Sequence, residues 1–273
     1  MNDLQKVELE VLKVFIDVCN KLNLNYFLVC GSCLGAARHG GFIPWDDDMD
    51  VGMYREDYNK FMEQAPALLP EGIFLQNYKT DPKFPMVFAK LRNSNTTYVE
   101  TDYSHLDVHH GVFIDIFPLD GYPPDSKEQK KTRLMEMKFS LLHSTAFKLN
   151  PNARWKGRIL YRVLRLLGCH KRLGKYNTKH ELYRSQFSVE KCGLVRDLGT
   201  KHKTPGIPKE YFGGGQEVLF EGIPVRIPAN SDGYLTCLYG DWRELPPPEE
   251  QVGHHYYAIC DTEKPYTYYL NKK

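Results

Sequence analysis

The chain has 273 residues, and its 36 Lys and Arg residues almost balance 34 Asp and Glu residues, which leaves a formal charge of +2. Hydrophobic residues make up 42% and charged residues 26%, so the composition excludes a disordered chain and supplies material for a large core. The length fits one large domain or two small ones.

The small net charge hides a strong segregation of charge along the chain. Residues 1–120 carry a net charge of −8, residues 121–191 carry +12 and residues 192–273 carry −2. The basic middle block predicts either a solvated helical face or a surface that contacts something anionic, such as a membrane.

Cysteine usage and hydropathy indicate the compartment. The seven cysteines are an odd number spread over a long chain, which is unlike the disulfide framework of a small secreted domain. Charged residues interrupt the N-terminal apolar residues, and no stretch approaches the ~20 apolar residues of a spanning helix. We therefore expect a cytoplasmic protein, with the inner face of the membrane as a place for peripheral contact.

Taken in chain order, the hydrophobic periodicity of the first half predicts alternating helices and strands. Apolar residues at three- and four-residue intervals predict a helix over 3–22. A buried strand from Tyr26 to Cys30 then leads through a tight turn into a helix at about 32–38. Alternation over 48–53 predicts the next strand. The further elements expected here are a helix at 55–69 and strands at 74–78, 86–92 and 112–117.

The second half is helical before it returns to strands. Residues 126 to about 192 have helical periodicity divided by Pro151, and VLFEGIPVRI predicts a hairpin. The fold class expected is α/β or α+β, a mixed sheet with flanking helices and a basic helical insertion. The expected division is a catalytic core at 1–122, a basic helical segment at 123–192 and a segment at 193–273 that packs back on the core.

The strongest chemical signal is the run WDDDMD, which ends at Asp50. Side chains alternate along a strand, so Asp48 and Asp50 are expected on one face, where both can bind one Mg²⁺ or Mn²⁺ ion. The alternative is a solvated acidic loop. Two further features favour the metal site: Gly31-Ser32 at a strand-to-helix turn, and the isolated Asp115 within the apolar strand VFIDIF.

These three features together resemble the nucleotidyltransferase superfamily of the DNA polymerase β type. That resemblance implies a polymerase-β-like sheet, in which Gly31 and Ser32 hold a nucleotide phosphate and Asp48, Asp50 and Asp115 hold Mg²⁺.

A longer string, CGSCLGAARHGGFIPWDDDMDVGMYREDYNKF, resembles the LicD family of phosphocholine transferases, whose relatives include fukutin-type proteins. The blocks FAKLRNSNTTYVE, HHGVFIDIFPLDG and FEGIPVRIPANSDGYLTCLYGDWRELPPPEEQVGHH match in the same order, whereas the basic block matches only in general character. The resemblance implies transfer of phosphocholine from CDP-choline to a hydroxyl of a cell-surface glycan precursor, of the teichoic acid or lipopolysaccharide type, with release of CMP. Other CDP-linked alditols are the alternative donors.

Positive and aromatic side chains in these blocks are candidates for substrate contacts. Arg38, Lys90 and Arg92 are expected to balance phosphate charge, with a plain surface cation as the alternative for each. The histidines in the matching blocks are expected mainly to cap or pack; they are His109, His110, His254 and His255. Aromatic rings could hold a quaternary ammonium, and the candidates are Trp45, Tyr98, Tyr103, Trp242, Tyr256 and Tyr257.

Four other functions compete with a CDP-choline transferase. Cys30 and Cys33 form a C-x-x-C, as in a redox protein, but that function leaves the aspartates unexplained. An EF-hand loop beginning at Asp46 would need Gly where Val51 stands. A D-x-D glycosyltransferase using a nucleotide sugar explains the metal but not Gly31-Ser32. A nucleic-acid polymerase shares the superfamily motif but not the longer blocks, so we expect no nucleic-acid partner.

The most basic helix expected lies over residues 155–167. Arg158, Arg162 and Arg165 follow at i, i+4 and i+7, and the opposite side carries Ile159, Val163, Leu166 and Leu167. Such a helix either lies on an anionic leaflet or packs in the core with a solvated basic face.

Overall fold

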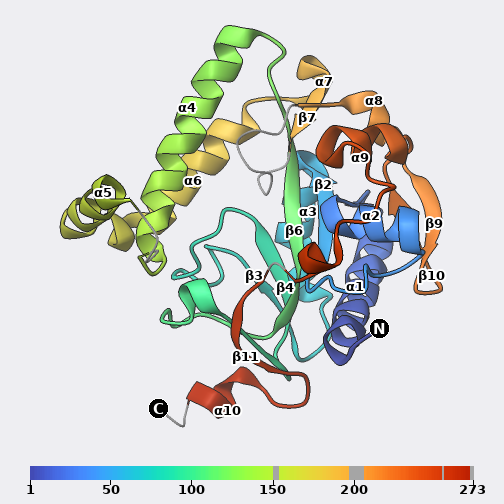
Figure 1. The fold of residues 1–273 in the computed structure, drawn as a ribbon, viewed down its shortest axis with the longest axis horizontal. Helices are drawn as coiled ribbons and strands as arrows, with labels where there is room; N and C mark the ends of the chain where they lie inside the picture. The colour runs from blue at the N-terminus through green and yellow to red at the C-terminus, as the bar shows by residue number, and fades with distance from the viewer. Residues whose placement is uncertain (150–153, 197–205, 254, 271–273) are drawn as a thin grey trace.

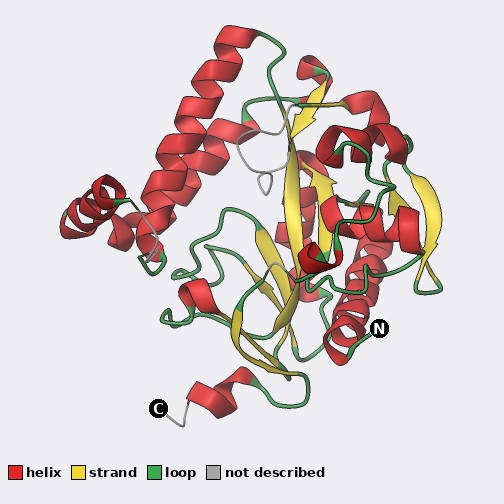
Figure 2. Ribbon diagram, in the orientation of Figure 1, coloured by secondary structure: helices red, strands yellow, loops and turns green. Residues whose placement is uncertain are grey.

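The computed structural model describes residues 1–149, 154–196, 206–253 and 255–270. A mixed sheet runs through the centre of the molecule, helices cover it, and a helical arm extends to one side (Figures 1 and 2). The fold is therefore the expected mixed α/β arrangement with flanking helices.

The first helix, α1 (Asp3–Leu22), begins at a capping box in which Asn2 and Gln5 bond each other's backbone. It ends at Asn23, whose left-handed backbone (φ 52°) stops the helix. Its apolar stripe packs on the central sheet, with Leu12 and Phe15 completely buried. The helix coincides with the expected range because its period and both caps agree.

The main sheet has the strand order β1-β2-β6-β4-β3, with β7 and β8 continuing from the far end of β6. Strands β2 and β6 are parallel, and the other described pairs are antiparallel. The strands of this sheet are β1 (Phe27–Leu28), β2 (Asp50–Tyr54), β3 (Ile73–Gln76), β4 (Ala89–Asn93), β6 (Val112–Gly121), β7 (Leu194–Arg196) and β8 (Ile207–Pro208).

Two small ribbons complete the strands. The expected hairpin is present as β9 (Gln216–Phe220) and β10 (Ile223–Ile227). The pairing of β5 (Thr97–Glu100) with β11 (Tyr257–Asp261) was not anticipated, because its strands lie far apart in the sequence and neither has a hairpin turn beside it.

Helices cover the sheet edges and build the arm. They are α2 (Cys30–His39), α3 (Arg55–Gln64), α4 (Ser126–His143), α5 (Trp155–Leu166), α6 (Leu173–Ser185), α7 (Val189–Cys192), α8 (Lys209–Phe212), α9 (Ser231–Tyr239) and α10 (Tyr266–Leu270). Helix α3 ends earlier than expected because a short 3-10 turn containing Pro66 follows it. Pro151 lies outside the described residues. None of the described helices is both long and apolar enough to cross a bilayer.

Buried ion pairs join the arm to the sheet. Asp120, near the end of β6, accepts two hydrogen bonds from Arg55 at 2.8 and 2.6 Å and lies 3.6 Å from Arg184 of α6. Glu136 of α4 pairs with Arg184 and also with Arg196 of β7. Because these charges are desolvated, removing one partner would leave an expensive unpaired charge, so the arm is firmly attached at this end.

Helix α5 corrects the sequence prediction in two respects. Its apolar face is exposed, which rules out the core helix, one of the two alternatives that the sequence left open: Leu166 is 87% exposed and none of the helix's residues is buried. Arg165 does not share the basic face with Arg158 and Arg162, because its guanidinium turns inward and donates to the carbonyl of Thr145 at 3.2 Å.

Candidate active site

The Gly-Ser pair lies in the first turn of α2, directly after β1. The Ser32 hydroxyl oxygen accepts a 2.7 Å hydrogen bond from the backbone N–H of Asp50, which fixes this turn to the start of β2. A Cβ on Gly31 would lie 3.0 Å from the Asp46 carboxylate, so glycine permits a close approach. Backbone N–H groups of a first helical turn lack helical partners, and this turn therefore offers donors to an anion beside the carboxylates.

Three charged side chains stand side by side across three strands. Asp50 of β2 is in register with Asp115 of β6, which in turn is in register with Lys90 of β4. Side chains of residues that pair in this way point to the same face of a sheet. The Lys90 ammonium lies 2.8 Å from the Asp115 carboxylate. The sheet thus brings together two of the three predicted strand carboxylates and one predicted cation.

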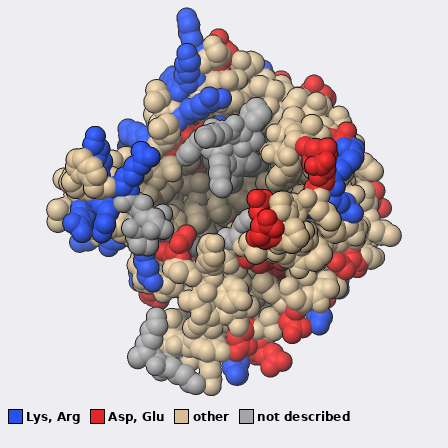
Figure 3. Space-filling model, in the orientation of Figure 1, with Lys and Arg blue, Asp and Glu red and all other residues tan. Residues whose placement is uncertain are grey.

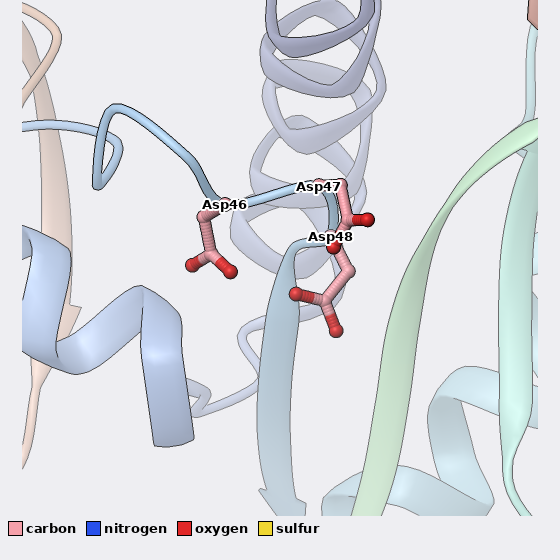
Figure 4. A group of neighbouring side chains, drawn as sticks. All are labelled: Asp46, Asp47 and Asp48. Atoms are coloured by element: carbon pink, nitrogen blue, oxygen red, sulfur yellow. The ribbon is translucent and has the colours of Figure 1, made fainter. Parts of the chain in front are cut away.

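The acidic run itself precedes the strand. Strand β2 begins at Asp50, so Asp48 lies in the connecting loop and not within the strand as expected. Oxygens of Asp46, Asp47 and Asp48 lie within 4.8 Å of one another. Figure 4 shows Asp47 and Asp48 next to each other, with the Asp46 carboxylate directed to the same side as that of Asp48, toward β2 and α2.

Crowding perturbs the acidity of this loop. Burial, together with the charges of Asp48 and Asp47, raises the pKa of Asp46 to about 8. Burial also raises the pKa of Asp48, although His255 and Lys90 oppose the shift. Negative charges held this close in a partly desolvated place are unfavourable unless protons or cations are bound.

A further carboxylate, Glu8, reaches the same place from α1. It is buried, and its Oε2 atom has no hydrogen-bond partner among the described residues. Burial, reinforced by Asp48 and Asp46, raises its pKa well above the usual range. Sequence reasoning missed Glu8, although a signal existed: it falls within the stripe of α1 that also contains Leu12 and Phe15.

The C-terminal part of the chain closes over the acidic loop. The backbone N–H of His255 donates to the Asp47 carboxylate at 3.0 Å, and the His255 ring lies 3.5 Å from Asp48. Gly253 approaches so closely that a Cβ would lie 2.4 Å from Asp47. His254 lies outside the described residues. Among the singled-out histidines that the structure describes, which are His109, His110 and His255, it is His255 that contacts these aspartates.

The predicted cations have different environments. Lys90 is buried between Asp115 and Glu100 and lies 3.3 Å from the centroid of the Phe113 ring. Arg92 is also buried, and its guanidinium donates to Gln76, to the Gly111 carbonyl and to Glu100. The guanidinium N–H groups of Arg92 are therefore used in hydrogen bonds within the protein, and the bond to Glu100 positions that carboxylate next to Lys90.

Arg38 lies at the end of α2. Its guanidinium donates to the backbone carbonyls of Trp242 at 2.8 Å and Glu244 at 3.3 Å. It thereby fixes the segment after α9 beside a cavity of about 870 Å³ that opens next to Gly31 and Asp46.

The remaining candidates have structural surroundings. His109 stacks on Phe74 and contacts the Ser94 hydroxyl, and burial lowers its pKa to about 3. Cys30 and Cys33 are not joined in a disulfide in the structure, and burial raises the pKa of Cys33, which is opposite to the activation that a redox pair needs.

The donor set at the acidic loop fits a hard divalent cation. Its atoms are carboxylate oxygens that lie within 4.8 Å of one another, and the pKa values of two of the carboxyl groups, Asp46 and Asp48, are raised, which a bound cation would relieve. The buried Glu8 carboxyl, whose Oε2 atom lacks a hydrogen-bond partner among the described residues, is a further oxygen donor near this loop.

A mixed sheet that carries carboxylates on neighbouring strands, beside a Gly-Ser helix start, defines a nucleotidyltransferase-type domain. The family model described as LicD/FKTN/FKRP, nucleotidyltransferase domain, matches residues 23–152. The chain is 30% identical over 263 residues to the lipopolysaccharide cholinephosphotransferase LicD of Haemophilus influenzae, covering 93% of this chain and 96% of that relative. The protein therefore belongs to the LicD family.

Shorter matches extend the comparison. Over 103 residues the chain is 48% identical to the human ribitol 5-phosphate transferase FKRP; the matched region covers 36% of this chain and 19% of that protein. A Rickettsia typhi protein, RT0683, is 34% identical over 70 residues, covering 26% of this chain and 23% of that protein.

Proposed function

We propose that this protein transfers phosphocholine from CDP-choline to a hydroxyl of a cell-surface glycan precursor, of the teichoic acid or lipopolysaccharide type, and releases CMP. The observation that carries the proposal is the almost end-to-end match with a relative named as a lipopolysaccharide cholinephosphotransferase. The clustered carboxylates beside a helix N-terminus are consistent with it, because phosphoryl transfer depends on positioning and on neutralisation of phosphate charge.

The proposed metal ligands are Asp48, Asp50 and Asp115, with Asp46 as a neighbour that shares the charge. Mg²⁺ is the cation proposed, and Mn²⁺ would suit the same oxygen donors. When bound, the cation would neutralise charge on the diphosphate and on the departing CMP.

The chain's own groups would hold the donor in place. Gly31 and Ser32 would present backbone N–H groups to a phosphate oxygen, since the Ser32 oxygen is already occupied as an acceptor from Asp50. Lys90 would orient Asp115 and favour its ionised form, against the effect of burial, which raises the pKa of Asp115. Arg38 and Arg92 would act on the donor through the segments that they fix, and a direct phosphate contact by either requires it to release a protein carbonyl or carboxylate.

The reaction breaks one phosphorus–oxygen bond and forms another. The acceptor hydroxyl oxygen bonds to the phosphorus of the phosphocholine unit, and the bridging oxygen leaves with CMP and the electron pair. The proton of the acceptor hydroxyl goes to Asp115 or to solvent.

Two alternatives concern the donor. A CDP-linked alditol is favoured by the match to a protein named ribitol 5-phosphate transferase. A nucleotide sugar, used with Asp48 and Asp50 as a D-x-D pair, leaves the Ser32 contact with the Asp50 backbone without a role.

A donor panel tests the proposal. The protein is incubated with Mg²⁺, a glycan acceptor and CDP-choline, CDP-ribitol, CDP-glycerol or a nucleotide sugar, and the released nucleotide is identified. We expect CMP from CDP-choline, and its loss in Asp48→Asn and Asp115→Asn. Asp107→Asn is the matched control, because Asp107 is exposed and pairs with Lys83 at the surface. Release from a nucleotide sugar alone would contradict the proposal.

We also propose that α5 brings the enzyme to the anionic inner leaflet of the membrane, where a lipid-linked acceptor would be met. Seven cysteines that form no disulfide in the structure suit the cytoplasmic side. Helix α5 is attached by one side only, where Tyr161 donates to the Phe147 carbonyl at 2.8 Å. The exposed side carries Trp155, Ile159, Leu160, Val163, Leu166 and Leu167.

Charge complementarity selects the partner of this apolar face. Residues 137–180 contain eleven Lys and Arg residues and no Asp or Glu. Figure 3 shows Lys and Arg side chains gathered on the arm at the left edge, on either side of the uncharged surface of α5. An apolar stripe flanked by cations is suited to the interface of an anionic bilayer, where each cation contributes about 1 kcal/mol.

Vesicle flotation tests the membrane contact. We expect binding to vesicles containing phosphatidylglycerol but not to neutral vesicles, with loss of binding in Ile159→Ser/Leu166→Ser and weaker binding in Arg158→Gln/Arg162→Gln. Leu219→Ser is the control, because Leu219 is a similarly exposed leucine on β9. Unchanged flotation of the double-serine variant would rule out α5 as the contact.

Within this proposal, residues 1–122 act as the catalytic core and residues 123–192 as the basic helical segment. Residues 193–273 serve as the segment that packs back on the core.

A further inference from the structure

The cavity beside the Gly-Ser turn is shared with the acidic site. It has a volume of about 870 Å³ and lies between α2, the loop before β2 and the segment that follows α9. Gly31 and Asp46 both line it. A ligand phosphate at the acidic site would therefore have the rest of the ligand within reach of this cavity.

Aromatic rings are concentrated in the cavity. Two of the chain's three tryptophans, Trp45 and Trp242, line it together with Tyr239. The Trp242 ring is held in place because its indole N–H donates to Asp232 at 3.1 Å. Arg243 already lies over the same ring, 4.5 Å from the centroid, which shows that a cation can approach its face. Tryptophan is the strongest of the aromatic partners for a cation.

The charge of the cavity is negative. One cation, Arg38, lines it, and its guanidinium is engaged by two backbone carbonyls. The carboxylates that line it are Asp46, Asp241, Glu244, Glu249 and Glu250. Such a wall repels the phosphates of a donor and attracts a positive group. An uncharged polyol would gain little from the electron-rich faces of the rings.

We infer that this cavity receives the quaternary ammonium of the choline headgroup, with Trp45, Trp242 and Tyr239 as the aromatic contacts and the glutamates at its rim as the counter-charge. The inference rests on the proposed function and names the part of the site that would distinguish choline from ribitol or glycerol. A trimethylammonium cannot donate hydrogen bonds, so ring faces and nearby carboxylates are the groups suited to hold it.

The experiment separates charge from shape. kcat/KM is measured for CDP-choline, for its 3,3-dimethylbutyl analogue, in which carbon replaces nitrogen, and for CDP-ribitol. We expect the wild type to prefer CDP-choline to the uncharged analogue, and Trp242→Leu to reduce that preference about tenfold. The double change Glu249→Gln/Glu250→Gln, at exposed positions that leave folding intact, should reduce it as well.

Trp155→Leu is the matched control, because Trp155 lies on α5 outside this cavity. Equal use of CDP-choline and its carbon analogue by the wild type would overturn the inference while the proposed function stands. Equal loss for both donors in Trp242→Leu would also overturn it, because that is the result of a merely structural role.

If the protein turns over none of the donors, calorimetric binding measurements still test the cavity assignment separately from the proposed transferase function. Phosphocholine and its carbon analogue are titrated into the protein with Mg²⁺. Selective binding of phosphocholine that weakens in the glutamine variant supports the cavity assignment even where the transferase proposal fails. Equal binding, or binding of neither, rejects the assignment.

Discussion

Lys90 and Asp115 face each other on neighbouring strands and form an ion pair of 2.8 Å whose side chains are only 2% and 5% exposed. Glu100 lies 3.4 Å from the same ammonium, so one cation stands between two carboxylates. A pair this deeply buried is costly to break, because each partner loses its compensation for desolvation.

We therefore predict that Lys90→Met destabilises the fold by about 3–5 kcal/mol, since it leaves Asp115 and Glu100 without their shared cation. Chemical denaturation measures the loss. The control is Lys83→Met, which removes an exposed pair with Asp107 and should change stability by less than ~0.5 kcal/mol. If Lys90→Met and Lys83→Met lowered the free energy of unfolding equally, the claim that burial makes the Lys90 pair important would be wrong.

The acidic loop predicts a pH-dependent effect of metal. Because the folded-state pKa of Asp46 is raised to about 8 from 3.8, its contribution to stability is fully present below about pH 4 and is lost as the pH rises toward 8. A bound cation would replace the proton. Added Mg²⁺ should therefore raise the melting temperature more near pH 8.5 than near pH 5, and Asp46→Asn should reduce this difference. An increase in melting temperature on addition of Mg²⁺ that is the same at both pH values would argue against a metal at this loop.

Two buried histidines predict acid sensitivity. Burial lowers the pKa of His109 to about 3 and that of His143 to about 4, from 6.5. The unfolded chain binds these protons first, so the stabilising contribution is present above about pH 6.5 and is lost as the pH falls through the folded-state values. His143→Leu should move the acid unfolding transition, followed by circular dichroism, to lower pH. A transition at higher pH would contradict this assignment.

The close approach of Gly253 to Asp47 predicts an effect on activity. In Gly253→Ala the new Cβ would collide with the carboxylate, so either the C-terminal segment or Asp47 must move. We expect a weaker apparent affinity for Mg²⁺ and a lower rate of CMP release with little change in melting temperature. Gly174→Ala is the control, because nothing lies within 4 Å of its added Cβ. Full activity of Gly253→Ala would show that this contact is dispensable.

Local patterns predicted the elements whose signals are local. Helix α1 has an unbroken period and two caps, and the hairpin around Gly222 has its turn between two apolar runs, so both were found. The sequence predicted the two strands that carry Asp50 and Asp115, but not the register that places these residues side by side. Pairing between strands far apart in the chain leaves no periodic pattern in the sequence.

The same limit explains what was missed. The electrostatic interaction of Glu8 with the acidic loop and the contact of His255 with Asp48 arise from packing between segments far apart in sequence. Arg165 follows Arg158 and Arg162 at helical spacing, but α5 contacts the rest of the protein through the side that carries Arg165. The periodicity of a helix does not predict which of its sides a neighbouring segment will cover.

The contact between Asp47 and the backbone of His255 spans 208 positions of the chain. During synthesis the N-terminal helix, the Gly-Ser turn and the acidic run all leave the ribosome long before the segment that covers them. The carboxylates therefore remain uncovered until the segment that contains His255 has emerged. A nascent chain that lacks this segment would expose an uncovered cluster of negative charge. The acidic loop therefore reaches its final covered form only after the segment around His255 has been made.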